Sequence, residues 1–277
     1  MKPSLVRTGP TRRDVLMGLA ASAALGPLSR LTLAAPRFQV FDALLYSGRR
    51  DLSRYGIQPL PTLYNLWRPQ SPHGAIDYTA MRAALGALPN WASLYFIDIE
   101  YWPLLQVSPS VRDSSISKFL EVAKIARSAR PGARFGFYNV APIGTYWAIL
   151  MQQSKEYPEW LRANRALDPL AAMVDVLFPS LYTFYNEPGG WMTVAQGILA
   201  EARRYGKPVY PFLWPEFHDS NRQLAGQVIP ADFWAAQLRF CRENADGVVL
   251  WGGYQHQWDE NAAWWQTTRE ALGLTPK

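Results

Sequence analysis

The chain has 277 residues, 49% of them hydrophobic and 18% charged, which suits one large globular domain and excludes an extended disordered chain. Its formal net charge of +6 rests mainly on residues 1–35, which hold five of the 28 basic residues and one of the 22 acidic ones. The rest of the chain carries a formal charge of only +2, with no concentrated basic patch. This distribution argues against a nucleic-acid-binding surface.

The segment 1–35 is typical of an export signal. Two arginines at 12–13 precede a run rich in Ala, Leu and Gly at 17–28, and small residues follow at 34–35. This order predicts a twin-arginine signal, read by the twin-arginine export machinery and cleaved near residue 35, and a periplasmic or secreted mature protein. A retained membrane anchor is the alternative, but the apolar run is short and is interrupted by glycine and proline.

The cysteine and histidine content argues against disulfide and metal chemistry. Cys241 is the only cysteine, so no internal disulfide can form, and its helix-like context predicts a packed, inert thiol. The three histidines, His73, His218 and His256, show no spacing typical of a metal site. We therefore expect no metal and no cofactor.

From residue 36 onwards, short β-rich runs alternate with amphipathic segments, the pattern of a parallel α/β fold. We expect seven strands, at 38–42, 60–65, 94–98, 134–137, 174–178, 209–213 and 247–251. Helices are expected at 78–85 after Asp77, 116–123 after Asp113, 194–202, around Trp234 and Leu238, and at 264–272, with 52–55 as a short candidate.

Seven βα units predict one distorted TIM-like (β/α) barrel over residues 36–277, a single catalytic domain. A doubly wound sheet is the alternative. No GxGxxG or GxxxxGK(S/T) phosphate loop follows any of the expected strands, which favours the barrel.

The third expected strand ends in two carboxylates, Asp98 and Glu100, within LYFIDIEYWP at 94–103. Residues two apart along a strand share a face, so both acids point the same way. Acidic side chains are rarely buried unless they are paired or hydrogen-bonded, so this pair indicates the mouth of a cleft. The alternative is a strand that enters a loop with Glu100 in solvent.

Aromatic and polar side chains recur at the ends of the other strands. They are Tyr64, Asn65 and Trp67; Tyr138 and Asn139; Tyr182 and Tyr185; Trp214, Glu216 and His218; and Trp251, Tyr254 and Gln255. In barrels of this type the carboxyl ends of the strands carry the active site. Because aromatic faces stack on sugar rings and polar groups bind their hydroxyls, we expect a carbohydrate cleft. The candidate substrate-binding residues are Tyr64, Tyr138, Asn139, Tyr182, Tyr185, Trp214, Glu216 and Trp251. The alternative is that these aromatics simply fill the top of the barrel.

Four segments, in order, resemble the hyaluronidases of glycoside hydrolase family 56. They are FIDIEYWPL (96–104), RPGARFGFYNV (130–140), VDVLFPSLY (174–182) and ADGVVLWGG (245–253). The similarity spans most of residues 36–277 but is dense only in these blocks. The resemblance implies a distorted barrel with fewer than eight strands.

The resemblance also implies a reaction. The family's D-x-E pair matches Asp98 and Glu100, with Glu100 as the general acid and base and Asp98 as the group that orients the substrate. The nucleophile would be the 2-acetamido oxygen of the substrate. The active-site tyrosines and cleft tryptophan of the family match Tyr138, Tyr182 and Trp251. Repulsion between the acids is expected to raise one pKa and to help Glu100 stay protonated near neutral pH.

The chain departs from the family in having no disulfides, in shorter loops and in the residues 101–103 that follow the acid. We therefore expect the reaction type of the family, but we do not expect hyaluronan itself to be the substrate. One alternative is a two-carboxylate glycosidase in which Glu216 acts opposite Glu100. Another is a carbohydrate-binding or assembly protein that kept the barrel without turnover.

Overall fold

The computed structural model describes residues 38–64, 66–68 and 74–277. The chain divides after Ala35, and all described residues belong to the second unit, Pro36–Lys277. The expected export signal, Asn65 and His73 lie outside the described residues, and those predictions stay open. Within the described part, no helix combines the length and apolarity that crossing a membrane requires.

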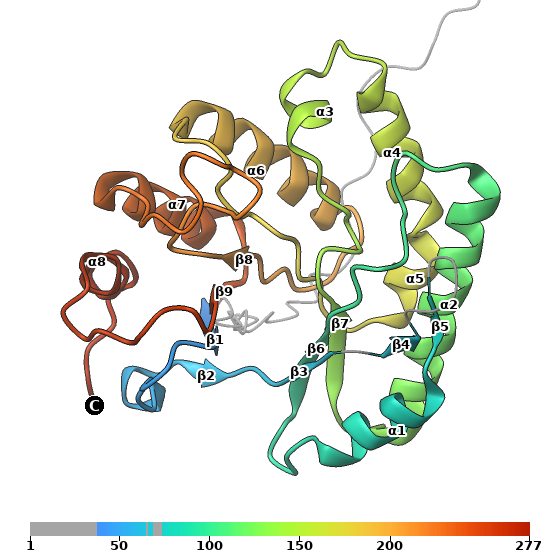
Figure 1. Ribbon diagram of the computed structural model, residues 1–277, viewed down its shortest axis with the longest axis horizontal. Coiled ribbons are helices and arrows are strands. Elements are labelled where there is room, and N and C mark those ends of the chain that lie inside the picture. The colour runs from blue at the N-terminus through green and yellow to red at the C-terminus, as the bar shows by residue number, and fades with distance from the viewer. Residues whose placement is uncertain (1–37, 65, 69–73) are drawn as a thin grey trace, which may run out of the picture. The chain divides into compact units, whose positions relative to one another are not determined.

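Parallel strands form the centre of this unit, and helices pack around them (Figure 1). One sheet has the order β2-β1-β9-β8 and another the order β3-β6-β7. Their bounds are β1 Gln39–Leu44, β2 Gln58–Pro59, β3 Thr62–Leu63, β6 Leu94–Ile97, β7 Arg134–Phe137, β8 Phe212–Leu213 and β9 Gly247–Gly252.

Two connections close these sheets into a ring. On one side, the stretch 174–180 bridges both sheets, because Phe178 pairs with Tyr138 of the β7 end and Ser180 pairs with Phe212 of β8. On the other side, β2 runs into β3, and the Leu60 amide donates to Asp42 O of β1 at 2.9 Å. The seven expected strand positions therefore form a distorted TIM-like barrel of parallel strands, which confirms the predicted fold class.

Three of the expected strands are less regular than predicted. The stretch 174–178 pairs through isolated bridges, the strand expected at 60–65 is reduced to β3 with β2 before it, and the strand expected at 209–213 is reduced to β8 with an isolated bridge at Val209. A short antiparallel hairpin, β4 Trp67–Arg68 with β5 Ala75–Ile76, follows and was not expected. Prolines at 59, 61 and 179 lack the N–H that a regular ladder needs, which explains the interruptions.

The expected helices are present, with shifted ends. They are η1 Ser53–Tyr55, α1 Tyr78–Ala87, α2 Pro109–Ala129, α6 Pro188–Arg203, α7 Ala231–Asn244 and α8 Ala263–Leu272. Asp77 caps α1 by accepting hydrogen bonds from the amides of Thr79 and Ala80. The expected start of the next helix after Asp113 is wrong, because Ser108 caps α2 and Pro109 occupies its first turn.

Three helices between β7 and α6 were missed: α3 Tyr146–Leu150, α4 Glu156–Ala166 and α5 Asp168–Met173. They are short, and Pro158 and Pro169 lie in the first turns of α4 and α5. In a sequence, proline at such positions indicates a turn or the end of a helix. In the fold, α3 packs against α4 and α6, and α5 packs against α2.

Aromatic side chains fill the barrel interior. Phe41, Phe96, Phe178 and Phe212 belong to one buried cluster inside the ring, separate from the cluster beneath the helices. Burial of each phenylalanine contributes about 1.5–3 kcal/mol. Gly136 is the small residue that this packing requires, because a Cβ there would lie 2.3 Å from Val176 O and 2.9 Å from the Phe178 ring.

Cys241 lies on α7 and is fully buried, as expected for a packed thiol. Burial raises its pKa far above the usual range, which disfavours the reactive thiolate.

Candidate active site

Strand β6 delivers Asp98 and Glu100 to the carboxyl end of the barrel. Phe96 faces the interior, and alternation places Asp98 on the same side. The Asp98 amide still donates to Leu63 O at 3.0 Å, so strand pairing holds this residue in place. Both acids line one pocket of about 150 Å³, the central pocket. Its lining is Phe96, Asp98, Glu100, Tyr138, Tyr182, Phe212, Trp214, His218, Asp219 and Trp251.

The two acids differ in their electrostatics. Burial, and next the negative charge of Glu100, raise the pKa of Asp98 from 3.8 to about 7. Partial loss of hydration also raises the pKa of Glu100, although this side chain lies at the exposed mouth of the pocket. The repulsion that we expected to favour protonated Glu100 therefore acts mainly on Asp98, the more deeply buried acid. Because the charges interact, the pair titrates as a unit and retains one proton up to about neutral pH.

Asp98 also has unused hydrogen-bonding capacity. Its Oδ1 is buried and accepts no hydrogen bond from the described residues. Buried polar atoms almost always have a hydrogen-bond partner. A carboxylate oxygen without one, inside a pocket, is therefore a favourable acceptor for a hydrogen-bond donor of a bound molecule.

Two tyrosines line the central pocket together with the acids. Tyr138 follows β7 and Tyr182 follows the stretch 174–180, and their ring centroids are 5.9 Å apart. The Tyr138 hydroxyl donates to Ser180 Oγ at 3.1 Å. Burial is the main reason that the pKa of each tyrosine lies well above its ordinary value, so both remain protonated hydrogen-bond donors.

Two tryptophans complete the wall. Trp251, at the end of β9, is half-buried and meets the buried Trp214 edge to face, with ring centroids 4.6 Å apart. The same ring lies 5.7 Å from Tyr182. Tyr64, at the end of β3, packs edge-on against Phe96 at 6.3 Å. Burial, and next the charge of Asp98, raise the pKa of Tyr64. Tyr64 is not among the described residues that line the central pocket.

Glu216 is placed elsewhere. It is 2% exposed, and its Oε1 accepts a 2.5 Å hydrogen bond from the Tyr46 hydroxyl. Glu216 is not among the described residues that line the central pocket. Strand alternation put Glu216 on the face of Trp214, but beyond Pro215 the chain leaves the strand and pairs antiparallel with Val228. Its carboxylate therefore faces Tyr46 and not the acids.

Asn139 and Tyr185 also lie outside the central pocket. Asn139 has a φ of 49°, and its Oδ1 accepts a 3.2 Å hydrogen bond from the Gly144 amide, so it shapes the loop after β7. Tyr185 packs against Tyr146 and Trp147 of α3 at 5.0 and 5.3 Å. The sequence grouped Tyr185 with Tyr182 because both follow the same strand, but alternation no longer applies beyond the strand end.

The sequence pattern missed two polar contributors to this region: Ser180 binds Tyr138, and Asp219 lines the central pocket. His218, which was placed at a strand end but not among the candidate substrate-binding residues, lines the central pocket as well. The only available signal was their position beside the motifs FPSLY and PFLWPEFHD, which is weak. Among the described residues, no cluster of His, Cys, Asp and Glu has a geometry that could hold a metal ion.

Comparison with solved structures supports the barrel assignment. The chain is similar to bee venom hyaluronidase, with a TM-score of 0.63 and 19% identity over 86% of this chain and 97% of that one. It is equally similar to the bee venom enzyme in complex with a hyaluronic acid tetramer, with a TM-score of 0.62 and 20% identity over 86% and 96% of the two chains. The sequence matches no protein-family model and no curated protein. At this identity the similarity shows a shared fold, and it confirms the remote resemblance stated from the sequence.

Proposed function

We propose that this protein is a retaining glycoside hydrolase that cleaves an N-acetylhexosamine-containing polysaccharide by substrate-assisted catalysis. The observation that carries the proposal is the Asp98 and Glu100 pair, which shares a pocket with two protonated tyrosines and a half-buried tryptophan. The resemblance of the same residues to the hyaluronidase motifs, and the shared barrel, support this assignment.

Glu100 would act as the general acid and then the general base. When Asp98 accepts a hydrogen bond from the substrate, the proton that the pair retains is left to Glu100, whose pKa burial raises. Glu100 donates this proton to the glycosidic oxygen as the bond to the anomeric carbon breaks. The 2-acetamido oxygen attacks that carbon and forms an oxazolinium ion. Glu100, now a carboxylate, takes a proton from the water that opens this ring, which regenerates the acetamide and the protonated acid.

Asp98 would orient the acetamido group. Its unpaired Oδ1 can accept the amide N–H of the substrate, and this contact holds the acetamido oxygen in position for attack. Positive charge then develops on the same amide beside Asp98, which favours the carboxylate form. Tyr138 and Tyr182 keep their hydroxyl protons throughout, and Trp251 offers its exposed face to a sugar ring.

The charges of the pocket favour a neutral substrate over a polyanion. Three carboxyl groups, on Asp98, Glu100 and Asp219, line the central pocket, and no lysine or arginine is among its described lining residues, so the pocket is negatively charged even while the acid pair retains one proton. A carboxylate-bearing sugar would meet repulsion there. We therefore favour a neutral N-acetylhexosamine polymer, such as a chitin-type chain, over hyaluronan.

The Glu100→Gln variant tests this function. We expect it to lose at least about a hundredfold in kcat on N-acetylchito-oligosaccharides while it keeps its melting temperature, because the amide fills the same space but cannot donate the proton. Product release measured by chromatography gives the rate. The control is Glu243→Gln, which changes an exposed glutamate on α7 and should leave the rate unchanged. Undiminished hydrolysis by Glu100→Gln would remove Glu100 from the acid role.

One observation favours a second candidate, a two-carboxylate glycosidase. Asp219 is exposed and lines the central pocket with Glu100, whereas Glu216 does not. If a second carboxylate acts, Asp219 fits the position better than Glu216. Loss of activity in Asp219→Asn, together with cleavage of substrates that lack the acetamido group, would favour this candidate.

A further inference from the structure

An exposed aromatic surface lies beside the central pocket but is not part of it. Tyr146 and Trp147 of α3 pack against Tyr185, with ring centroids 5.0 to 5.3 Å apart, and we call these three residues the platform. Trp147 is 54% exposed. A large aromatic side chain held by its neighbours with its face in solvent has the form of a sugar-stacking surface.

A second hollow adjoins the platform. This outer pocket has a volume of about 300 Å³ and is lined by Leu105, Gln106, Thr145, Trp147, Ala148, Lys155, Glu156, Glu159 and Trp160. Apolar walls with a few polar groups are typical of saccharide and other small-ligand sites. Lys155 and Glu156 have opposite charges. The rim therefore offers hydrogen bonds without a strong electrostatic potential that would favour a charged ligand.

Aromatic rings connect the platform to the central pocket. His218, which lines the central pocket, lies 4.7 Å from the ring of Phe184. Phe184 lies 6.1 Å from Tyr146, the first residue of the platform. A small cavity between them is lined by Tyr182 of the central pocket and by Thr145 of the outer pocket. The two pockets are therefore linked through shared walls.

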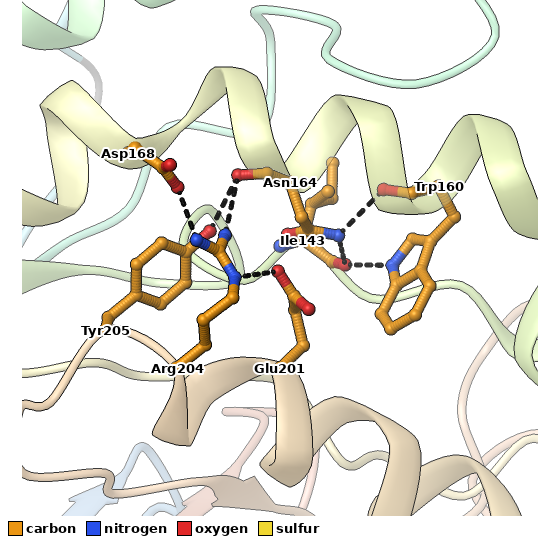
Figure 2. A network of polar contacts seen from close by, with 7 residues as sticks. All are labelled: Ile143, Trp160, Asn164, Asp168, Glu201, Arg204 and Tyr205. Atoms are coloured by element: carbon orange, nitrogen blue, oxygen red, sulfur yellow. Dashed lines mark hydrogen bonds and ion pairs between the residues drawn. The ribbon is translucent and has the colours of Figure 1, made fainter. Parts of the chain in front are cut away.

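Helix α4 holds this region in place (Figure 2). Asn164 is fully buried; its Oδ1 accepts from the Ile143 amide at 2.9 Å, and its Nδ2 donates to Trp160 O at 3.1 Å. The Trp160 indole donates to Ile143 O at 2.7 Å. Towards the C-terminal end of α4, Arg204 and Tyr205 donate hydrogen bonds to Asn164 O. The loop between Asn139 and Trp147 is thus fixed to a helix before any ligand binds, which lowers the entropic cost of recognition.

Backbone conformation marks the same region. In the described chain, the non-glycine residues with positive φ are Gln106, at 56°, and Asn139, at 49°. Gln106 lines the outer pocket, and Asn139 lines the small cavity that joins the two pockets. Such conformations are unfavourable for residues with a Cβ and gather at ligand sites, where the surroundings enforce them.

We propose that the platform and the outer pocket form an accessory subsite that binds neutral pyranose units of a polysaccharide whose cleaved bond lies in the central pocket. This inference rests on the proposed function and adds to it an extended cleft and a preference for long, uncharged chains. The sugar stacks on Trp147, and its hydroxyls bind the polar rim of the outer pocket.

The experiment measures binding in the Glu100→Gln background, in which the substrate is not turned over. N-acetylchitotetraose, N-acetylchitooctaose and hyaluronan oligosaccharides of the same two lengths are titrated by calorimetry. Adding Trp147→Ala should weaken binding of the chitooctaose about tenfold and leave that of the tetraose nearly unchanged, because only the longer chain reaches the platform. Trp147→Tyr should restore most of the loss. The control is Trp91→Ala, which removes a tryptophan that is 60% exposed just before β6, at the opposite end of the strands.

The outcomes separate the two claims. If Trp147→Ala and Trp91→Ala bind the chitooctaose equally well, the accessory subsite is wrong while the proposed function stands. If hyaluronan oligosaccharides bind more tightly than the chitin series, the preference for neutral sugars is wrong. If neither series binds to Glu100→Gln, the proposed substrate class fails, and the subsite fails with it.

Discussion

Asp98 is the residue at which burial and function conflict most clearly. Its carboxyl has a pKa of about 7 in the folded protein against 3.8 when exposed, so the folded state binds this proton more tightly than the unfolded chain does. The contribution of Asp98 to stability is therefore most favourable below about pH 4 and is lost as the pH rises through about 7. Above that window, the protein holds a buried negative charge at a cost in stability.

Because the pKa of Asp98 is raised in the folded state, we expect Asp98→Asn to increase the free energy of unfolding by an amount that depends on pH. At about pH 8 the variant should be more stable than the wild type by roughly 2–4 kcal/mol, since one pKa unit corresponds to about 1.4 kcal/mol. Near pH 4 the gain should almost vanish, because wild-type Asp98 is then neutral. Urea unfolding at both pH values measures the difference, with the exposed Asp113→Asn on α2 as the control. An equal gain at both pH values would show that burial of the charge is not its origin.

Among the elements, α4 supports the loop that follows β7. Replacement of Asn164 by alanine should destabilise the protein by roughly 2–4 kcal/mol, because it leaves the amide of Ile143 without its acceptor and removes the hydrogen bonds that Asn164 Nδ2 donates to Trp160 O and Ile143 O. The matched control is Asn244→Ala at the exposed end of α7, where a single hydrogen bond to Phe240 O is lost and less than 1 kcal/mol is expected. Thermal unfolding compares the two. Similar losses would mean that the α4 network contributes no more than an exposed hydrogen bond.

Elements were predictable where local pattern and packing agree. Strands β6 and β9 are continuous apolar runs, β7 is apolar and buried after Arg134, and the sequence located each of them within two residues. Helices α3 to α5 were missed because α3 and α5 are too short to show a helical period and because prolines stand in the first turns of α4 and α5, where the sequence pattern indicates a break. The platform on α3 could not be predicted for the same reason.

At the scale of the whole molecule, the sequence placed the acids but not all of their surroundings. Alternation along β6 sufficed to put Asp98 and Glu100 on one side, since a strand fixes side-chain direction. Beyond the strand ends that rule fails. Glu216 turns to Tyr46, and Tyr185 joins the platform, because loop conformation decides where they point. Which of the two acids has the more strongly raised pKa also depends on how deeply each is buried, and a sequence does not reveal this.

The most direct test of the account is whether the nucleophile comes from the substrate. The wild-type enzyme is given N-acetylchitooctaose and its fully de-N-acetylated counterpart, and the first products are analysed by nuclear magnetic resonance. Substrate-assisted catalysis predicts cleavage of the acetylated chain alone, with the anomeric configuration retained, because only that chain carries the attacking oxygen. Comparable cleavage of the de-N-acetylated chain, or inversion at the anomeric carbon, would contradict the proposed roles of Asp98 and Glu100.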